Sequence, residues 1–167
     1  MANPFNINHP ISSDIYLKLW RDAKEVNHSN FWEELIREFG YQIERNFINN
    51  LALSTQIVVK KSRMLYLHGY ILYAALCKYL ENISELVYIL ETGTARGFSA
   101  ICMAKALQDM DKKGRIHTID LLSHNEKIYW NCIHDNEEKK TRSDLLDKWN
   151  DLVSDITFHS GKTSSQL

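Results

Sequence analysis

Residues 86–120 have the sequence LVYILETGTARGFSAICMAKALQDMDKKGRIHTID, which predicts a strand, a turn, a helix and a second strand in that order. The run LVYILE is short, apolar and rich in β-branched and aromatic side chains, as is typical of a buried parallel strand. FSAICMAKALQDM, at 98–110, places apolar side chains at helical spacing, and the lysines and glycine that follow suit a helix end. RIHTID, at 115–120, is typical of another strand. The stretch is therefore predicted to be a βαβ unit of a doubly wound α/β fold.

The chain before this unit is predicted to be helical. Apolar periodicity and capping residues indicate four helices, over residues 14–26, 30–39, 43–51 and 64–80. Ser12 or Ser13 is expected to cap the first helix, and Gly40 to end the second. Residues 56–59 form a short β-prone run.

The chain after the unit is predicted to add one more strand. Residues 123–142 are dense in charge and are expected to form a solvated loop or an irregular insertion. A helix over residues 143–153, capped by Ser143, is expected next. Residues 155–161 read DITFHSG and indicate a third strand that ends in a glycine turn.

Length and composition fit one α/β body with two regions. We expect a helical N-terminal region over residues 1–84 and, over residues 85–167, a Rossmann-like half-domain whose parallel sheet carries helices on its faces. The chain has 167 residues, of which 44% are hydrophobic, enough for a real core. Its 20 basic and 21 acidic residues nearly cancel, which disfavours nucleic acid as a partner.

Cysteine usage and the lack of a targeting signal predict a cytoplasmic protein. Cys77, Cys102 and Cys132 are odd in number and widely spaced, which favours free thiols in a reducing compartment. The first ten residues show no secretory signal. Residues 64–80 are apolar but short of the ~20 residues that span a bilayer, and they include a histidine and a lysine, so no membrane partner is expected.

The turn after the first strand carries the chemistry. Gly93 lets the backbone turn sharply and lets a ligand approach closely, and Gly97 begins the helix. A helix N-terminus offers free N–H groups and binds anions. Asp120 ends the next strand, where a carboxylate accepts the hydroxyls of a ribose. Because Ala95 occupies the place of the middle glycine of a dinucleotide motif, the pattern favours another ribose-containing anionic ligand.

The sequence ETGTARGFS at 91–99 resembles the first motif of class I S-adenosylmethionine-dependent methyltransferases. It is nearest to the E-x-G-x-x-x-G-x-S form of the catechol-type O-methyltransferases and of the cephalosporin hydroxylase/macrocin O-methyltransferase group. IHTID is similar to that family's second strand, and ITFHSGKTSSQL to its third strand and the following turn. The resemblance covers roughly residues 86–167. The helical first half shares no motif with the family and resembles it only in being helical, because such enzymes often carry N-terminal helices that cover the cofactor or the substrate.

The resemblance implies which residues hold the methionine end of the cofactor. Glu91 would lie near the methionine ammonium group, and the backbone at Gly93 would pass beneath the methionine. Ser99 and the N–H groups around Gly97 would hold the carboxylate. Thr94 occupies a variable position of the motif beside them.

The resemblance also implies which residues hold the adenosine end. Asp120 would accept the ribose hydroxyls, and Leu121 would pack on the adenine. Thr163 or Ser164 would reach the edge of the adenine ring.

The activity implied is transfer of a methyl group from S-adenosylmethionine to an oxygen of a small-molecule acceptor. A divalent metal such as Mg²⁺ assists in complete members of the resembled group. Their metal ligands and general base lie on later strands, which this sequence does not include, so no catalytic residue is assigned. The chain is expected to be a cofactor-binding front half, truncated after the third strand, that binds without turnover.

Three alternatives stay open. Glu91 and Asp120 are compatible with ordinary roles at a turn and a strand end. The chain is also compatible with a nicotinamide-type Rossmann oxidoreductase, or with a non-catalytic nucleotide-binding or interaction fragment that forms homo-oligomers through an uncovered sheet edge. His124, Cys132 and nearby His134 and Asp135 offer metal-ligand atoms, but their spacing fits no standard zinc pattern, and no metal site is predicted.

Overall fold

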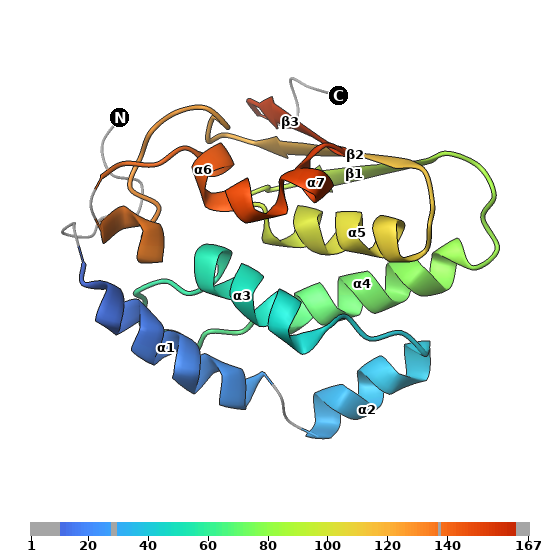
Figure 1. Ribbon diagram of the computed structural model, residues 1–167, viewed down its shortest axis with the longest axis horizontal. Helices are drawn as coiled ribbons and strands as arrows, with labels where there is room; N and C mark the ends of the chain where they lie inside the picture. The colour runs from blue at the N-terminus through green and yellow to red at the C-terminus, as the bar shows by residue number, and fades with distance from the viewer. Residues whose placement is uncertain (1–10, 28–29, 137, 163–167) are drawn as a thin grey trace.

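The protein has a mixed α/β fold, seen in a computed structural model that describes residues 11–27, 30–136 and 138–162 (Figure 1). Its elements follow the chain in the order α1 (Ser13–Val26), α2 (Asn30–Phe39), α3 (Arg45–Thr55), α4 (Leu67–Leu80), β1 (Val87–Thr92), α5 (Phe98–Asp109), β2 (Gly114–Asp120), η1 (Ile133–Asn136), α6 (Arg142–Leu146), η2 (Asp147–Trp149), α7 (Asn150–Val153) and β3 (Ile156–Ser160).

The three strands form a parallel sheet in the order β1-β2-β3. Helix α5 connects β1 to β2, and the α6–η2–α7 segment connects β2 to β3. Glu91 pairs with Thr118 in the register, and Asp120 pairs with Ser160. The carboxyl ends of the strands therefore meet at one edge of the sheet. The predicted parallel α/β sheet is confirmed.

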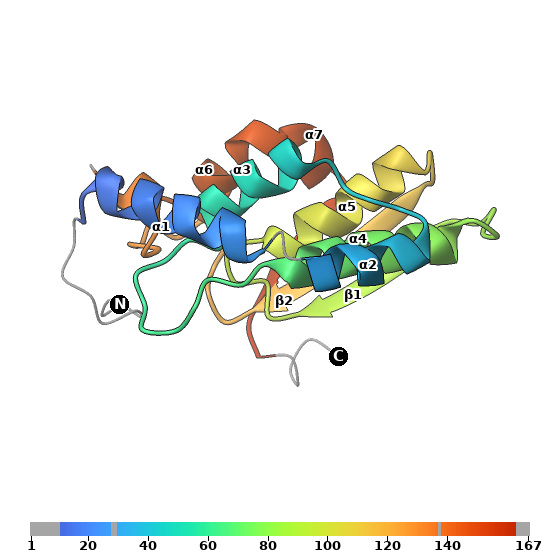
Figure 2. The same ribbon diagram turned by 90° about the horizontal axis from the view of Figure 1, so that it is seen from below.

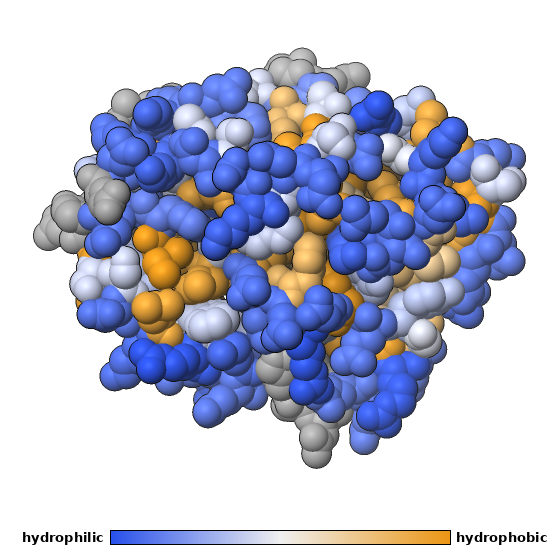
Figure 3. Space-filling model, viewed as in Figure 1, coloured by the Kyte–Doolittle hydropathy of each residue, from blue (hydrophilic) through white to orange (hydrophobic). Residues whose placement is uncertain are grey.

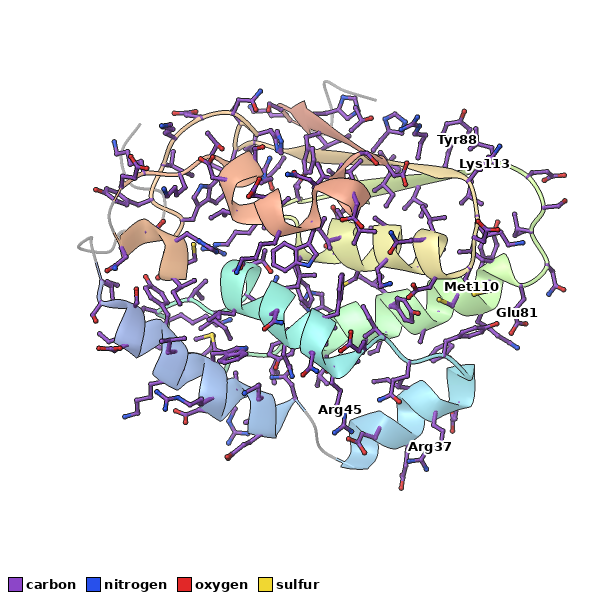
Figure 4. All side chains as sticks on the ribbon, viewed as in Figure 1. Arg37, Arg45, Glu81, Tyr88, Met110 and Lys113 are labelled. Carbon is purple, nitrogen blue, oxygen red and sulfur yellow. The ribbon has the colours of Figure 1, made fainter. Side chains whose placement is uncertain are left out.

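The two faces of the sheet differ in burial. Val87 and Ile116 are buried in the main core, together with Leu107 of α5. On the other face, Tyr88 is 68% exposed and Leu90 is 55% exposed. Tyr88, labelled in Figure 4, lies on the side of β1 away from α5. We call this second face the outer face; it carries Tyr88, Leu90, Arg115, His117, Thr157 and His159.

One hydrophobic cluster joins the N-terminal helices to the sheet. It runs from Tyr16 of α1 through Ile48 of α3 and Leu80 of α4 to Ile101 of α5 and Ile156 of β3. In Figure 1 helix α5 lies next to the strands, α4 and α3 lie beyond it, and α1 and α2 lie farthest from the sheet, while Figure 2 shows the same helices from below. The four predicted N-terminal helices are thus present, and they share a core with the sheet.

The caps of the first two helices follow the sequence pattern. The Ser12 hydroxyl accepts a hydrogen bond from the Asp14 N–H at 3.3 Å at the start of α1. Gly40 follows α2 with a φ of 77°, in the left-handed region that glycine adopts readily.

The β-prone run at 56–59 forms no strand. Ile57 and Val58 are buried, and the backbone of Val59 pairs with a side chain instead of a strand. The Asn131 carboxamide accepts from the Val59 N–H at 2.9 Å and donates to the Val59 carbonyl at 3.0 Å. One amide side chain thus supplies the donor and the acceptor that a neighbouring strand would have offered.

Residues 123–142 form an irregular insertion, the second of the two expectations, and not a solvated loop. Ile128 and Lys140 form an antiparallel bridge. Trp130 and Cys132 are buried in a second small core with Leu145 of α6. The buried carboxylate of Asp135 accepts hydrogen bonds from the N–H groups of Trp130 and Cys132, so polar residues here form an interior. Their partners lie within the segment, where charge density gives no sign of them.

The helix expected over 143–153 is broken into α6, η2 and α7. Its cap is Thr141 and not Ser143, because Thr141 and Asp144 form a reciprocal capping box. Leu146, Trp149 and Leu152 are buried at a spacing of three residues, which matches the period of a 3₁₀ turn better than that of an α-helix.

Cys77, Cys102 and Cys132 are free, as predicted, and they are buried. Trp130 and Trp149 are also buried. Burial raises the pKa of the Cys132 thiol to about 12, so it is protonated near neutral pH. Within the described residues, no helix is long and apolar enough to cross a membrane. Figure 3 shows a mostly hydrophilic face with smaller apolar patches.

Helices α4 and α5 approach closely at Gly69, and this contact gives a prediction. A Cβ on Gly69 would lie 2.5 Å from Cε1 of Phe98 and 3.0 Å from Sγ of Cys102. Alanine in a helix is favoured over glycine by about 1 kcal/mol, but overpacking a core costs about 1–3 kcal/mol. Gly69→Ala is expected to lower the free energy of unfolding by urea, and the loss should shrink in a Phe98→Leu background. A Gly69→Ala protein more stable than the wild type would refute the close contact.

Candidate functional site

A cleft lies at the carboxyl ends of the three strands. It has a volume of about 550 Å³ and is lined by Gly93, Ile119, Asp120, Leu121, Leu122, Gly161 and Lys162. Ligand sites usually measure about 300–1,000 Å³. In open α/β sheets, ligands bind outside the carboxyl ends of the strands. The cleft therefore has the size and position of a small-molecule site.

The turn from β1 to α5 brings two glycines to this edge for different reasons. Gly93 has a φ of 86°, and no heavy atom lies within 4 Å of the place where its Cβ would stand. Gly97 has a φ of 90°, and its Cβ would lie 2.8 Å from Cδ1 of Leu146. Gly93 thus faces open space beside the cleft, whereas Gly97 makes room for α6 to pack.

Helix α5 starts at this turn without a side-chain cap. Gly97 is its N-cap residue, and no side chain accepts a hydrogen bond from the first turn. The free N–H groups of a first turn, with the helix dipole, favour an anionic partner. The start of α5 therefore offers backbone donors beside Gly93.

The Glu91 carboxylate is partly buried and is held by two hydroxyl groups. The Ser99 hydroxyl donates to Oε1 of Glu91. The Thr118 hydroxyl lies 2.5 Å from Oε2 of Glu91 and 2.6 Å from the Thr94 hydroxyl. The structure thus brings together the predicted residues Glu91, Thr94 and Ser99 as one hydrogen-bonded group. Because the Ser99 hydroxyl proton is used here, the backbone N–H of Ser99 is its donor for an outside anion.

Asp120 lines the cleft and also braces two turns. Its Oδ2 accepts from the Ala95 N–H at 2.8 Å, and its Oδ1 accepts from the Leu122 N–H at 2.8 Å. Each carboxylate oxygen has about two acceptor positions, so both oxygens retain capacity for another donor. The Asp120 side chain is 14% exposed. Asp120 thus connects the turn after β1 to the turn after β2.

Leu121 has an exposed apolar side chain at the cleft. It is 69% exposed, the largest fraction among the large exposed hydrophobic residues of the described chain. Such a side chain would lose contact with water if a flat apolar ring covered it. Thr163 and Ser164, predicted to reach the adenine edge, lie outside the described residues.

Arg142 is a site-forming residue that the sequence analysis missed. Its Nε donates to the Ala95 carbonyl at 2.8 Å, and its guanidinium donates to the Leu122 carbonyl at 3.1 Å. The same guanidinium lies 3.9 Å from Oδ1 of Asp120, and the Arg142 side chain is 1% exposed. Burial lowers the pKa of Arg142, while the charges of Asp120 and Glu91 raise it. The guanidinium therefore remains a buried cation beside the Asp120 carboxylate.

The sequence held no usable sign of this role. Arg142 follows Lys139, Lys140 and Thr141, and a run of this kind is normally a solvated surface. Its partner Ala95 lies 47 residues earlier in the chain.

Arg96 ties the same turn to the second small core. Its guanidinium donates to the Trp130 carbonyl. The turn at 93–97 is therefore anchored by protein on two sides, at Arg142 and at Arg96.

The histidines near the site have mostly structural surroundings. The His124 ring stacks on Phe158 with centroids 3.9 Å apart. Burial, and then the charge of Arg142, lower the pKa of His124, which favours the neutral ring. Nε2 of His134 lies 3.0 Å from the Ser54 hydroxyl. In the part of the chain that the structure describes, no group of three or more histidine, cysteine or acidic side chains is placed to hold a metal ion.

Comparisons with known proteins add no assignment. No protein-family model, no curated protein and no solved structure matches the chain.

The bracing by Arg142 gives a prediction. Arg142→Met would leave two carbonyl groups and the Asp120 carboxylate without their buried cation, so the free energy of unfolding should fall by about 3 kcal/mol or more. Arg142→Lys should lower the free energy of unfolding somewhat less, because lysine keeps the positive charge but lacks the planar guanidinium that bonds to two carbonyl groups. Urea unfolding measures both.

Arg115→Met is the matched control. Arg115 is 54% exposed and lies 3.8 Å from Asp155, an exposed pair whose loss should cost about 1 kcal/mol or less. Equal losses in Arg115→Met and Arg142→Met would contradict the bracing role.

Proposed function

We propose that the cleft binds S-adenosylmethionine and that the chain serves the transfer of its methyl group to an oxygen atom of a small molecule. The observation that carries the proposal is the open position at Gly93, which lines the cleft together with Asp120. A backbone position without a side chain and a carboxylate in the same lining suit a ribose-containing ligand that lies close to the turn.

The adenosine end has suitable partners. Asp120 keeps acceptor capacity on both oxygens while the N–H groups of Ala95 and Leu122 fix its orientation. Two ribose hydroxyls could thus donate to a carboxylate that is already positioned, with little ordering cost. Leu121 offers an exposed apolar surface for the adenine ring next to Asp120.

The methionine end has complementary partners as well. The uncapped start of α5 offers N–H donors for the carboxylate. Glu91, held by Ser99 and Thr118, supplies a fixed negative charge at the end of β1. A fixed carboxylate favours the positive ammonium and sulfonium groups of this ligand. These residues support the proposal through charge and placement.

S-adenosylmethionine supplies an electrophilic methyl group when bound. The part of this chain is to hold the ligand in one orientation, since alignment of the reacting atoms provides much of the rate of such transfers. No described residue is assigned as the base that takes the acceptor proton. A divalent metal has no set of three ligands among the described residues, so no step is derived through one.

Binding to the cleft is tested with a pair of glycine variants. Gly93→Ala should weaken S-adenosylhomocysteine binding about tenfold or more, equivalent to ~1.4 kcal/mol, because the new methyl group occupies the ligand's space. Isothermal calorimetry measures the affinity, and NADH titrated under the same conditions should bind far more weakly. Gly93 is a better position to alter than Asp120. Asp120 also braces two turns, so the loss of its carboxylate would change folding and binding together.

Gly40→Ala is the matched control. Gly40 has a φ of 77° and, like Gly93, nothing within 4 Å of its Cβ position, so both variants carry a similar left-handed strain of about 1–2 kcal/mol. Gly40 lies after α2, outside the cleft lining. Unchanged binding in Gly93→Ala, or an equal loss in Gly40→Ala, would count against the proposed site. Tighter binding of NADH would favour an oxidoreductase instead.

A further inference from the structure

Two histidines meet on the outer face of the sheet. His117 lies on β2 and His159 on β3, and Nδ1 of His117 is 3.1 Å from Nε2 of His159. The two rings have centroids 5.4 Å apart and planes 26° apart. Tyr88 of β1 stacks on the other side of His117, with centroids 6.4 Å apart. Three rings thus form a row across the three strands.

The backbone places this pair beside the cleft. His159 pairs in the strand register with Ile119, which lines the cleft. His117 is two residues before Ile119, so its side chain projects to the same face of β2. The histidine pair therefore lies on the outer face, next to Ile119 of the cleft lining.

We propose that His117 and His159 bind a divalent transition-metal ion, with Cu²⁺ held most tightly and Ni²⁺ and Zn²⁺ less tightly. Imidazole nitrogens suit these ions, and affinity for a given nitrogen site peaks at Cu²⁺. The site is independent of the proposed cofactor cleft in its residues and in its test.

The separation of the two nitrogens fits a shared ion. With metal–nitrogen bonds of about 2.0–2.1 Å, two neighbouring ligands lie about 2.9 Å apart at a right angle and about 3.3 Å apart at the tetrahedral angle. The observed 3.1 Å lies between these values. Both side chains are partly buried at an open surface, and the ring torsion of histidine is broad, so each ring can turn its lone pair to a common point.

The proton balance of binding is simple. In the metal-free pair, one of the two facing nitrogens donates its proton to the other. On coordination, His117 binds through Nδ1 with its proton on Nε2, and His159 binds through Nε2 with its proton on Nδ1. No proton is then released on binding, and water completes the coordination of the ion.

The cationic side chain on the outer face is directed away from the histidine pair, so it would repel a bound metal ion little. Arg115 is the one cationic side chain of the outer face as defined above, and its guanidinium donates to the Ser154 carbonyl at 3.0 Å and lies 3.8 Å from Asp155. Its charge is therefore directed toward the start of β3, at the end of the sheet opposite the cleft.

The test is Cu²⁺ titration of the full chain, without cofactor, followed by electron paramagnetic resonance and calorimetry. His117→Gln and His159→Gln should each weaken the tightest site about tenfold or more, because each removes one arm of a chelate. The double variant should lose little more Cu²⁺ affinity than either single variant. His68→Gln, at an exposed histidine of α4, is the matched control and should bind as the wild type does.

A measurement on the wild type avoids any effect of substitution on folding. With Zn²⁺ added, ¹⁵N NMR of the histidine rings should show coordination at Nδ1 of His117 and at Nε2 of His159. Coordination at other histidines, or single variants that keep the full Cu²⁺ affinity, would overturn the proposal. Loss of S-adenosylhomocysteine binding would leave it standing, since neither histidine lines the cleft.

Discussion

The buried guanidinium of Arg142 holds together the two turns on which the site depends. Its hydrogen bonds to the carbonyls of Ala95 and Leu122 join the turn after β1 to the turn after β2. Asp120 completes the bracing from the other side, since it accepts the N–H groups of the same two residues. Each turn thus has a donor and an acceptor fixed by a charged side chain. Charge-assisted hydrogen bonds of this kind are stronger than neutral ones, and here they replace regular secondary structure at the edge of the sheet.

The bracing sets the geometry of the cleft. Ala95 is held with a φ of 47°, in the left-handed region that costs a non-glycine residue about 1–2 kcal/mol, and its fixed peptide groups offset that cost. With Ala95 anchored, Gly93 keeps its backbone turned toward open space. A ligand would therefore meet a wall that is already formed and would not have to order a loose loop. A preformed wall of this kind raises affinity mainly by lowering the entropy lost on binding.

The sequence predicted the parts of this fold that depend on local pattern. The strand, turn, helix and strand of residues 86–120, and the positions of Gly93 and Asp120 at strand ends, follow from periodicity and glycine placement. The roles of Arg142 and Asp135 do not. The Arg142 partner Ala95 lies 47 residues away in the chain. The Asp135 partners are close in sequence, but they lie in a charged run that resembles a solvated loop. The pairing of Ser99 with Glu91 was likewise hidden, since a motif gives residue types but no hydrogen-bond directions. The assignment of S-adenosylmethionine came from the resemblance of the motif, and it remains a proposal.

We propose that the two braced turns form one binding surface for S-adenosylmethionine. Amide ¹H–¹⁵N NMR spectra recorded during titration with S-adenosylhomocysteine test it most directly, because every backbone N–H reports separately. If the two turns bind the ligand, saturable shifts should be concentrated at the amides of residues 93–99 and 120–122. Ala95 and Leu122 should be among them, and the amides of α1 and α2 should be unaffected. An unchanged spectrum at millimolar ligand, or shifts confined to another part of the chain, would contradict it.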